Sequence, residues 1–274
     1  VAAAGTSADE LLIVAGSDSG GGAGLQADIK TATAYGVFAT TAVTAITVQD
    51  TRGVHGVHAI PDETIAAQMR VVLEDIGTDA VKTGMLHSAG TIEAVAAMLA
   101  AHAPETKLVA DPVMVAKGGA RLIDDTAVAA MKAVLIPRAA LLTPNAPEAS
   151  ALLGIGELRS VEDLILAGRE LRALGAAAVL MKGGHLPGET VADVLIGPEG
   201  EEVFSGPRIH SAHTHGTGCT LASAIASGLA LGWDLRDAVE TARAFVTKAI
   251  ETAPGLGHGH GPLNHMFGIG RPWI

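Results

Sequence analysis

Short apolar runs alternate along this chain with longer segments in which apolar residues recur every three or four positions. The first run, residues 11–16, reads Leu-Leu-Ile-Val-Ala-Gly and is typical of a strand buried on both faces. A helical segment follows it to about Tyr35, and the alternation continues to Thr252. We predict further strands at 40–49, 80–83, 108–111, 140–143, 177–182, 191–196 and 202–204, and further helices at 60–76, 88–102, 124–135, 145–153, 161–174, 217–232 and 234–252.

The order of these segments predicts an α/β fold with a mostly parallel sheet, because strands alternate with helices of about 10 to 15 residues. The segments 191–196 and 202–204 follow each other closely, as antiparallel strands do. No linker divides the chain, so we expect one domain. Ligands of such sheets bind beyond the carboxyl ends of the strands. The candidate site residues are therefore those at 16–18, 49, 83–85, 111–114, 143–148 and 182–185.

Residues 213–232 carry the clearest functional pattern. Their second half has helical spacing, and it is preceded by Gly216, Thr217 and Gly218. The first amides of a helix lack intrahelical partners and carry the positive end of its dipole, so we predict an anion site there. Cys219 falls in the first turn, where the dipole would lower the pKa of its thiol and let it act as a general base. The alternative is a capped surface helix with a small buried thiol.

Composition narrows the class of protein. Of the 274 residues, 49% are apolar but only 3% aromatic, so the core must consist of Ala, Val, Leu and Ile. The net charge of −11 argues against nucleic-acid and anionic-membrane partners. The single cysteine excludes an internal disulfide and suits a cytoplasmic protein. No apolar run approaches the ~18 residues of a membrane span, and we expect residues 1–10 to be a disordered lead-in without a signal-peptide pattern.

Two loops suggest nucleotide or metal binding. The segment 22–27 matches the relaxed dinucleotide fingerprint G-x-G-x-x-A, but it starts too far after Gly16 for a typical nicotinamide or flavin site, and no P-loop occurs. Asn145, with Glu148 three residues later, predicts a capping box. In the functional alternative, Glu148 and the strand-end Asp111 lie near a hydrated Mg²⁺.

Two polar residues end predicted strands. Lys182 follows the apolar run AAAVLM, from which it could reach a transferred phosphate or simply extend to solvent. Gln49 offers an adjacent donor and acceptor that match an aminopyrimidine edge, or it is a polar strand terminus. Two His-x-His pairs lack a Cys or carboxylate at ligand spacing, which argues against a structural metal at His213, His215, His258 and His260.

Eight motifs occur in order between residues 11 and 262: AGSDSGGGAGLQAD (15–28), VQDTRGV (48–54), KTGML (82–86), DPVM (111–114), LTPN (142–145), MKGGH (181–185), THGTGCTL (214–221) and GHGHGP (257–262). Together they resemble the motifs of the bacterial hydroxymethylpyrimidine/phosphomethylpyrimidine kinases of thiamine biosynthesis. The resemblance implies a ribokinase-like three-layer α/β/α sandwich with a mostly parallel central sheet, spanning 11–262 and followed by a tail at 263–274. It also implies a homodimer, Mg²⁺, and two ATP-dependent phosphorylations, of 4-amino-5-hydroxymethyl-2-methylpyrimidine to its monophosphate and then to the diphosphate.

The same resemblance implies roles for individual residues. Gln49 would bind the aminopyrimidine edge, Asp111 and Glu148 would lie near Mg²⁺, and Asn145 and Lys182 would lie near the phosphates. The ring pocket would be lined by Gly16, Ala23, Asp28, Met85 and Val113. The anion hole would consist of Gly216, Thr217, Gly218 and Cys219. This cysteine would stand where most ribokinase-like enzymes carry an Asp base.

One residue and one loop depart from the family pattern. His213 stands where the family usually has Asn, and residues 118–121 replace Ser-Gly-Asp-Pro in a loop expected to be mobile. Two other functions remain open: a pyridoxal or pyridoxine kinase of the same fold, and a non-catalytic ligand-binding module. Gln49 favours the aminopyrimidine over a pyridine, and the presence of Lys182 and Cys219 argues for catalysis.

Overall fold

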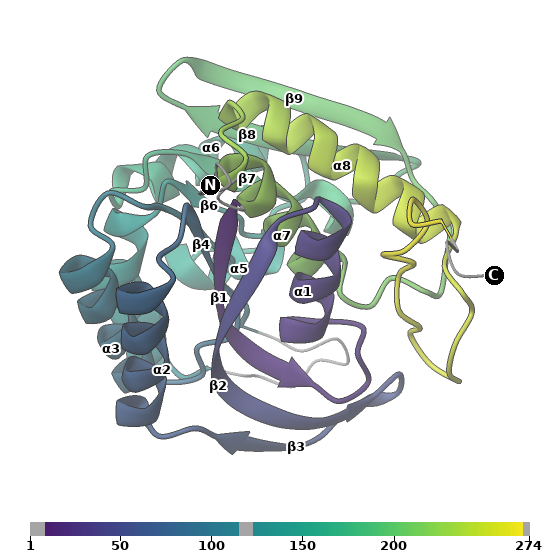
Figure 1. Cartoon of the computed structure of the whole chain (residues 1–274). Helices are drawn as coiled ribbons and strands as arrows, with labels where there is room; N and C mark the ends of the chain where they lie inside the picture. Colours follow the sequence, from purple (N-terminus) through teal and green to yellow (C-terminus); the bar gives the residue numbers. More distant parts are fainter. Residues whose placement is uncertain (1–8, 115–122, 271–274) are drawn as a thin grey trace, which may run out of the picture.

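Nine strands form one sheet in the part of the chain that the computed structural model describes, residues 9–114 and 123–270 (Figure 1). Their order is β3-β2-β1-β4-β5-β6-β7-β8-β9. The strands from β2 to β7 in this order are parallel, whereas β3, β8 and β9 pair antiparallel with their neighbours. Their bounds are β1 Glu10–Asp18, β2 Phe38–Asp50, β3 Gly53–Ala59, β4 Ala80–Thr83, β5 Lys107–Ala110, β6 Leu141–Leu142, β7 Val179–Met181, β8 Thr190–Gly197 and β9 Gly200–Pro207.

Helices cover both faces of this sheet and give the predicted three layers (Figure 1). One face is packed by α1, α7 and α8, and the other by α2 to α6. Their bounds are α1 Gly24–Ala34, α2 Asp62–Asp75, α3 Ala89–His102, α4 Asp125–Ala130, α5 Ala146–Leu153, α6 Val161–Ala173, α7 Thr217–Ala230 and α8 Leu235–Glu251. The predicted α/β/α sandwich is confirmed.

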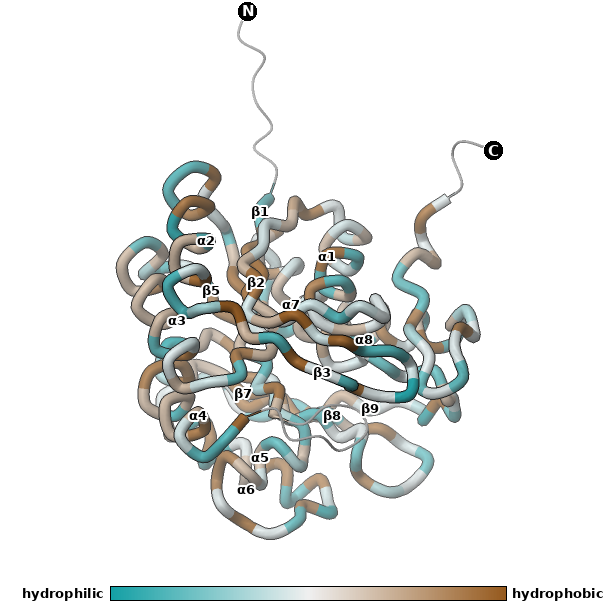
Figure 2. Tube along the Cα trace, turned by 90° about the horizontal axis from the view of Figure 1, so that it is seen from below, coloured by the Kyte–Doolittle hydropathy of each residue, from teal (hydrophilic) through white to brown (hydrophobic). Residues whose placement is uncertain are grey.

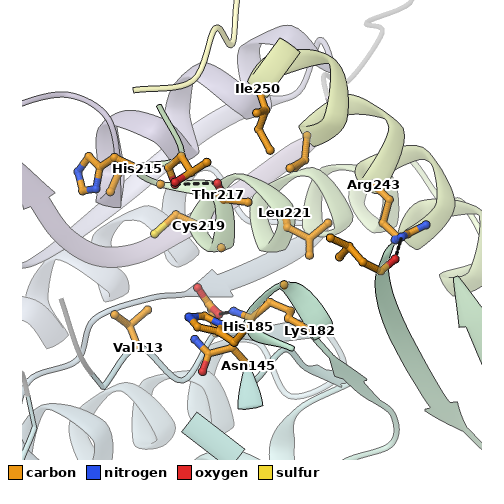
Figure 3. Close-up of a pocket in the computed structure, with 18 of the residues that line it drawn as sticks. Val113, Asn145, Lys182, His185, His215, Thr217, Cys219, Leu221, Arg243 and Ile250 are labelled. Atoms are coloured by element: carbon orange, nitrogen blue, oxygen red, sulfur yellow. Dashed lines mark hydrogen bonds and ion pairs between the residues drawn. The ribbon is translucent and has the colours of Figure 1, made fainter. Parts of the chain in front are cut away.

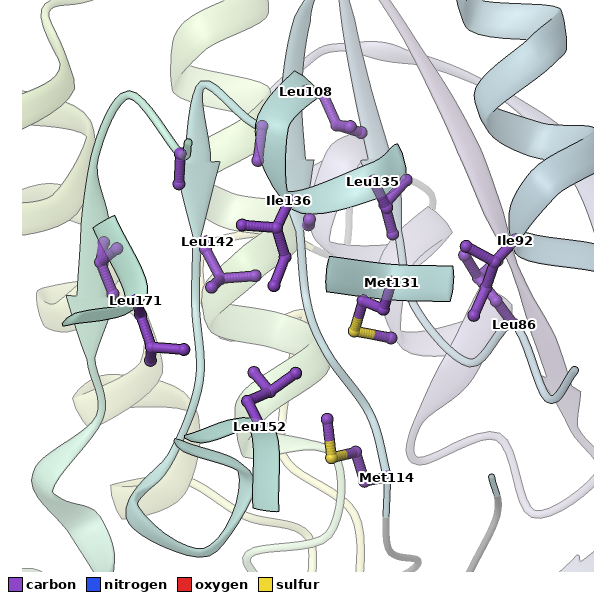
Figure 4. Packing of buried hydrophobic residues seen from close by; sticks show 14 of the residues in the cluster. Leu86, Ile92, Leu108, Met114, Met131, Leu135, Ile136, Leu142, Leu152 and Leu171 are labelled. Atoms are coloured by element: carbon purple, nitrogen blue, oxygen red, sulfur yellow. The ribbon is translucent and has the colours of Figure 1, made fainter. Parts of the chain in front are cut away.

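Strand β1 shows why its sequence is continuously apolar. Leu12 and Val14 lie in the core beneath α2 to α6, whereas Leu11 and Ile13 lie in the core beneath α1, α7 and α8. All four side chains are completely buried. Figure 4 shows part of the first core, where Leu142 of β6 packs among side chains from the covering helices. A strand covered on both faces needs apolar residues at every position.

Two elements differ most clearly from the prediction. Strand β3 was not predicted, because it is a largely exposed edge strand with the sequence GVHGVHA and has no apolar run. The helix predicted at 124–135 is α-helical only as far as Ala130 and continues as a π-helical turn, Met131–Leu135. Pro137 follows in a short 3₁₀ turn and, having no amide hydrogen, cannot extend the helix.

Glu10 begins β1 rather than ending a lead-in. Residues 1–8, the departing loop at 118–121 and residues 271–274 lie outside the described residues. None of the described helices is long and apolar enough to cross a bilayer.

Residues 255–270 form a coil with only an isolated bridge at Pro262. Leu263 and His265 are nevertheless buried, and Nε2 of His265 lies 2.9 Å from Oγ1 of Thr220 in α7. The division into a domain at 11–262 and a tail stays a prediction.

Candidate active site

One large cavity, of about 1270 Å³, lies at the carboxyl ends of the parallel strands. All of the residues to which the resemblance assigns a role, except Asp28, line it, including the ring-pocket residues Gly16, Ala23, Met85 and Val113. Figure 3 shows the start of α7 with Cys219 on one wall, and Lys182 with Asn145 on the wall opposite.

The N-terminus of α7 opens into this cavity. Gly216 has a φ of +84°, and a Cβ there would collide with the backbone carbonyl oxygen of Gly22, so only glycine fits. Within the described chain, the amides of Gly218 and Cys219 have no backbone acceptor, as expected for a first helical turn. Together with the helix dipole, these amides form a positively polarised site for an anion.

Lys182 follows β7 and lies beside the start of α7, since a Cβ on Gly218 would be only 3.2 Å from its Nζ. This Nζ lies 2.8 Å from Oδ1 of Asp111 and 3.6 Å from Oε2 of Glu148. Burial acts to lower the pKa of Lys182, but the two carboxylates outweigh burial and raise it above its ordinary value. Lys182 is therefore a permanent cation next to the helix amides.

Asn145 and Glu148 form the predicted capping box of α5. Oδ1 of Asn145 accepts from the amide of Glu148 at 2.9 Å, and Oε2 of Glu148 accepts from the amide of Asn145 at 2.8 Å. Burial raises the pKa of Glu148 to about 7, although the charge of Lys182 opposes this shift.

The two carboxylates fit a magnesium ion. Oε1 of Glu148 and Oδ2 of Asp111 have no hydrogen-bond partner among the described residues, because Lys182, Thr143 and the capping box use the other oxygens. Mg²⁺ keeps several waters and takes one or two protein carboxylates. Asp111 and Glu148 therefore offer the right kind and number of ligands.

The pKa predicted for the Cys219 thiol is wrong in direction. Burial raises this pKa to about 11, the buried Lys82 ammonium opposes the shift, and the carboxylates of Asp28 and Asp111 add to it. The helix dipole can be inferred from the sequence, but desolvation and neighbouring carboxylates depend on the fold. At neutral pH the thiol is therefore protonated in the unliganded protein.

Asp28 does not line the ring pocket, contrary to the prediction. It is completely buried on α1, where Oδ2 lies 2.7 Å from Nζ of Lys82 and Oδ1 accepts from Oγ of Ser223 at 2.6 Å. Lys82 on β4 is completely buried as well and borders the cavity. This network joins α1, β4 and α7 directly behind the anion site.

Two residues beside Gln49 had no role assigned from the sequence: His215, and Asp18 from the strand-end group at 16–18. Nε2 of His215 lies 2.9 Å from Oδ2 of Asp18 and 3.2 Å from the amide Nε2 of Gln49. Asp18 also accepts from three backbone amides of the glycine loop at 20–23. Burial acts to raise the pKa of Asp18, but the hydrogen bonds from His215 and from these amides outweigh it and lower the pKa. His215 was considered only as a metal ligand, and no group of three such ligands occurs among the described residues.

A basic rim of the cavity was also missed. Arg208, Arg243 and Lys248 line its outer part, and Nε of Arg243 lies 2.7 Å from Oδ2 of Asp193. No motif marks these residues, because Arg208 directly follows β9 whereas Arg243 and Lys248 lie in α8, and they meet only in the folded chain.

Open helix amides, a buried lysine and two carboxylates at the edge of a parallel sheet are the groups that position and stabilise a transferred phosphoryl group. The fold and the site thus define an α/β phosphotransferase. The chain belongs to the phosphomethylpyrimidine kinase family, because the sequence pattern that defines this family matches residues 18–264.

Individual relatives agree with this assignment. The chain is 51% identical over 257 residues to the thiamine biosynthesis bifunctional protein ThiED of Geobacter sulfurreducens, covering 94% of this chain but only 52% of that protein. It is 47% identical over 258 residues to the hydroxymethylpyrimidine/phosphomethylpyrimidine kinase of Bacillus subtilis, covering 94% of each. The ADP complex of Bacillus subtilis pyridoxal kinase matches with a TM-score of 0.88 and 39% identity, covering 94% of this chain and 97% of that one. The chain is a kinase, so a non-catalytic binding module is excluded as its main function.

Proposed function

We propose that this chain uses ATP to phosphorylate 4-amino-5-hydroxymethyl-2-methylpyrimidine to its monophosphate and then to the diphosphate, in thiamine biosynthesis. The observation that carries the proposal is that Gln49, Lys182 and Cys219 line one cavity. Gln49 supplies an adjacent donor and acceptor for the aminopyrimidine edge. Lys182 supplies a cation for the phosphoryl group, and Cys219 supplies a group that could take the proton of the hydroxymethyl oxygen.

The other residues have supporting roles in this proposal. The amides of Gly218 and Cys219 would bind oxygens of the migrating phosphoryl group, and Asn145 would lie near the nucleotide phosphates. Asp111 and Glu148 would hold Mg²⁺, which when bound neutralises charge on the phosphates. The apolar part of the wall, with Met85 and Val113, would contact the ring.

Replacing Cys219 with alanine is expected to slow the first phosphorylation about 100-fold more than the second. The first acceptor is an alcohol, which gains from a base, whereas the second is a phosphate whose second pKa is about 6 and which is already largely ionised. Because the thiol pKa is about 11, Cys219 would act from a thiolate formed only in the substrate complex. The two rates are measured separately, with Cys219→Ser as the variant of matched size. Equal losses in both steps would leave Cys219 only a packing role in the anion site.

The second candidate is phosphorylation of pyridoxal or pyridoxine. It is favoured by the close structural match to a pyridoxal kinase. Gln49 supports the aminopyrimidine instead, because a pyridine has no ring nitrogen next to an exocyclic amino group.

The proposal includes a homodimer in the cytoplasm. Apolar side chains on one face of the outer strand β2 are exposed in the single chain, with Ile46 at 48% and Val48 at 62%. Figure 2 shows hydrophobic segments recurring along β3 on this side of the molecule. An apolar strand surface of this kind supports pairing with a second copy, and the single free cysteine suits a reducing compartment.

The function is tested by incubating the chain with Mg²⁺, ATP and the hydroxymethylpyrimidine and following the products by ³¹P NMR. The proposal predicts a phosphate monoester that appears first and a diphosphate that replaces it. Hydrolysis of ATP without either product would contradict it.

A further inference from the structure

We infer that His215 and Thr47 fix the amide of Gln49 in one orientation and thereby make the cavity selective for a ring that carries an amino group beside a ring nitrogen. The inference rests on the proposed function, in which Gln49 faces the ring. It adds two positioning residues and a reason for discrimination between ring edges. The inference follows from which atoms around Gln49 must donate a hydrogen bond and which can only accept one.

The first requirement comes from His215. Its Nε2 lies 2.9 Å from Oδ2 of Asp18, and a carboxylate can only accept a hydrogen bond. Asp18 is ionised, because hydrogen bonds from His215 and from loop amides hold its pKa below the ordinary value in spite of burial. Nε2 of His215 therefore carries a proton. The structure places the amide nitrogen of Gln49 3.2 Å from this Nε2, but a protonated Nε2 has no lone pair that could accept from it. We therefore reverse the amide and assign the amide oxygen to this position, where it shares the single Nε2–H with Asp18.

The second requirement comes from the other side of the amide. Oγ1 of Thr47 lies 2.9 Å from the carbonyl oxygen of Ser17 and 3.1 Å from the Gln49 amide atom that the structure places as Oε1. A hydroxyl has one proton, and the carbonyl of Ser17 can only accept, so Thr47 donates to Ser17. The Gln49 atom beside Thr47 must therefore be the donor, which is the amide nitrogen. Two independent contacts thus require the same orientation, with oxygen toward His215 and nitrogen toward Thr47.

The surroundings hold His215 in place. A Cβ on Gly22 would lie 2.6 Å from Cδ2 of His215 and 3.1 Å from Cβ of Pro262, so the glycine loop and the C-terminal coil enclose the imidazole. The backbone amide of His215 donates to the carbonyl of Gly261 at 3.1 Å. The imidazole is only 9% exposed, and its contact with the buried Asp18 holds it in place.

A fixed amide presents a fixed pattern to the cavity. After its bonds to His215 and Thr47, Gln49 keeps one oxygen lone pair on the His215 side and one N–H on the Thr47 side. This pair matches an exocyclic amino group, which donates, next to a ring nitrogen, which accepts. A 4-oxo ring presents the reverse pattern, an acceptor next to a ring N–H. Gln49 could match that ring only by turning over, which His215 and Thr47 prevent.

The test compares the amino substrate with its 4-oxo analogue in the wild type, in His215→Leu and in Thr47→Val. We expect each substitution to lower the ratio of kcat/KM for the two compounds by about tenfold, the worth of one hydrogen bond. Part of the change should be a gain on the 4-oxo compound, because the amide can then turn over. Loss of structure alone would not raise activity on any substrate, and His215→Gln, which can restore an N–H, should recover part of the preference. An unchanged ratio in both variants would overturn the inference.

A second measurement needs neither variants nor turnover. The ¹⁵N chemical shifts of the His215 imidazole in the wild-type protein should show that Nε2 carries a proton. An unprotonated Nε2 would overturn the inference even if the kinase activity is confirmed. If the wild type phosphorylates neither pyrimidine, the proposed function fails, and the imidazole shifts still decide the orientation of Gln49.

Discussion

Replacing Lys182 with methionine is expected to lower kcat for both phosphorylations by about 10² to 10³. Its ammonium lies beside Gly218 at the start of α7 and 2.8 Å from Asp111, where the migrating phosphoryl group is expected. A preorganised cation there stabilises charge that develops in the transition state. The KM for the pyrimidine should change little, because Lys182 is not expected to contact the ring. Steady-state kinetics of each step measure both effects.

The matched control is Lys107→Met, which removes an exposed lysine at the start of β5. Its kcat should equal that of the wild type. Lys182→Met should still fold, because Glu148, whose pKa burial already raises to about 7, can take up a proton when the neighbouring cation is removed. A kcat within tenfold of the wild type in the folded variant would contradict the role given to Lys182.

Replacing Lys82 with methionine is expected to lower the free energy of unfolding by about 3 to 5 kcal/mol at neutral pH. The substitution leaves the carboxylate of Asp28 completely buried, with Ser223 as its one remaining side-chain partner among the described residues. Burial raises the pKa of Asp28 even with Lys82 present, and without the opposing cation the shift should grow. The folded variant then binds a proton that the unfolded chain releases. The loss of stability should accordingly shrink as the pH falls and grow as it rises.

The control combines Lys82→Met with Asp28→Asn, which removes both charges and keeps an oxygen for Ser223. Denaturant unfolding should show most of the lost stability restored, because the unpaired charge rather than the packing causes the loss. If the double variant is as unstable as Lys82→Met alone, the ion pair is not what supports α1, β4 and α7 behind the anion site.

The architecture could be predicted well from the sequence, because burial on both faces leaves a continuous apolar run. Strand β4 was predicted at its observed bounds, Ala80–Thr83, where all four residues are buried. Strand β3 could not be predicted in this way, because an exposed edge strand needs no apolar run. Strand β6 was predicted longer than it is because the buried backbone around Leu141–Leu142 continues beyond its two paired residues.

The site residues likewise include some that could be predicted from the sequence and some that could not. Residues at strand ends, such as Gln49, Asp111 and Lys182, could be predicted because parallel topology brings those ends together. Asp28 could not be placed, since its partner Lys82 lies 54 positions away and only the folded chain shows their contact. The contact of His215 with Gln49 spans 166 positions for the same reason.

The measurement that tests the central claim most directly is ATP-dependent turnover of the hydroxymethylpyrimidine and of pyridoxal, side by side, with mono- and diphosphate products separated. The account predicts that the pyrimidine is converted to its monophosphate and then to its diphosphate, with a higher kcat/KM than pyridoxal. Phosphorylation of pyridoxal alone would contradict it and would remove the substrate role of Gln49 first.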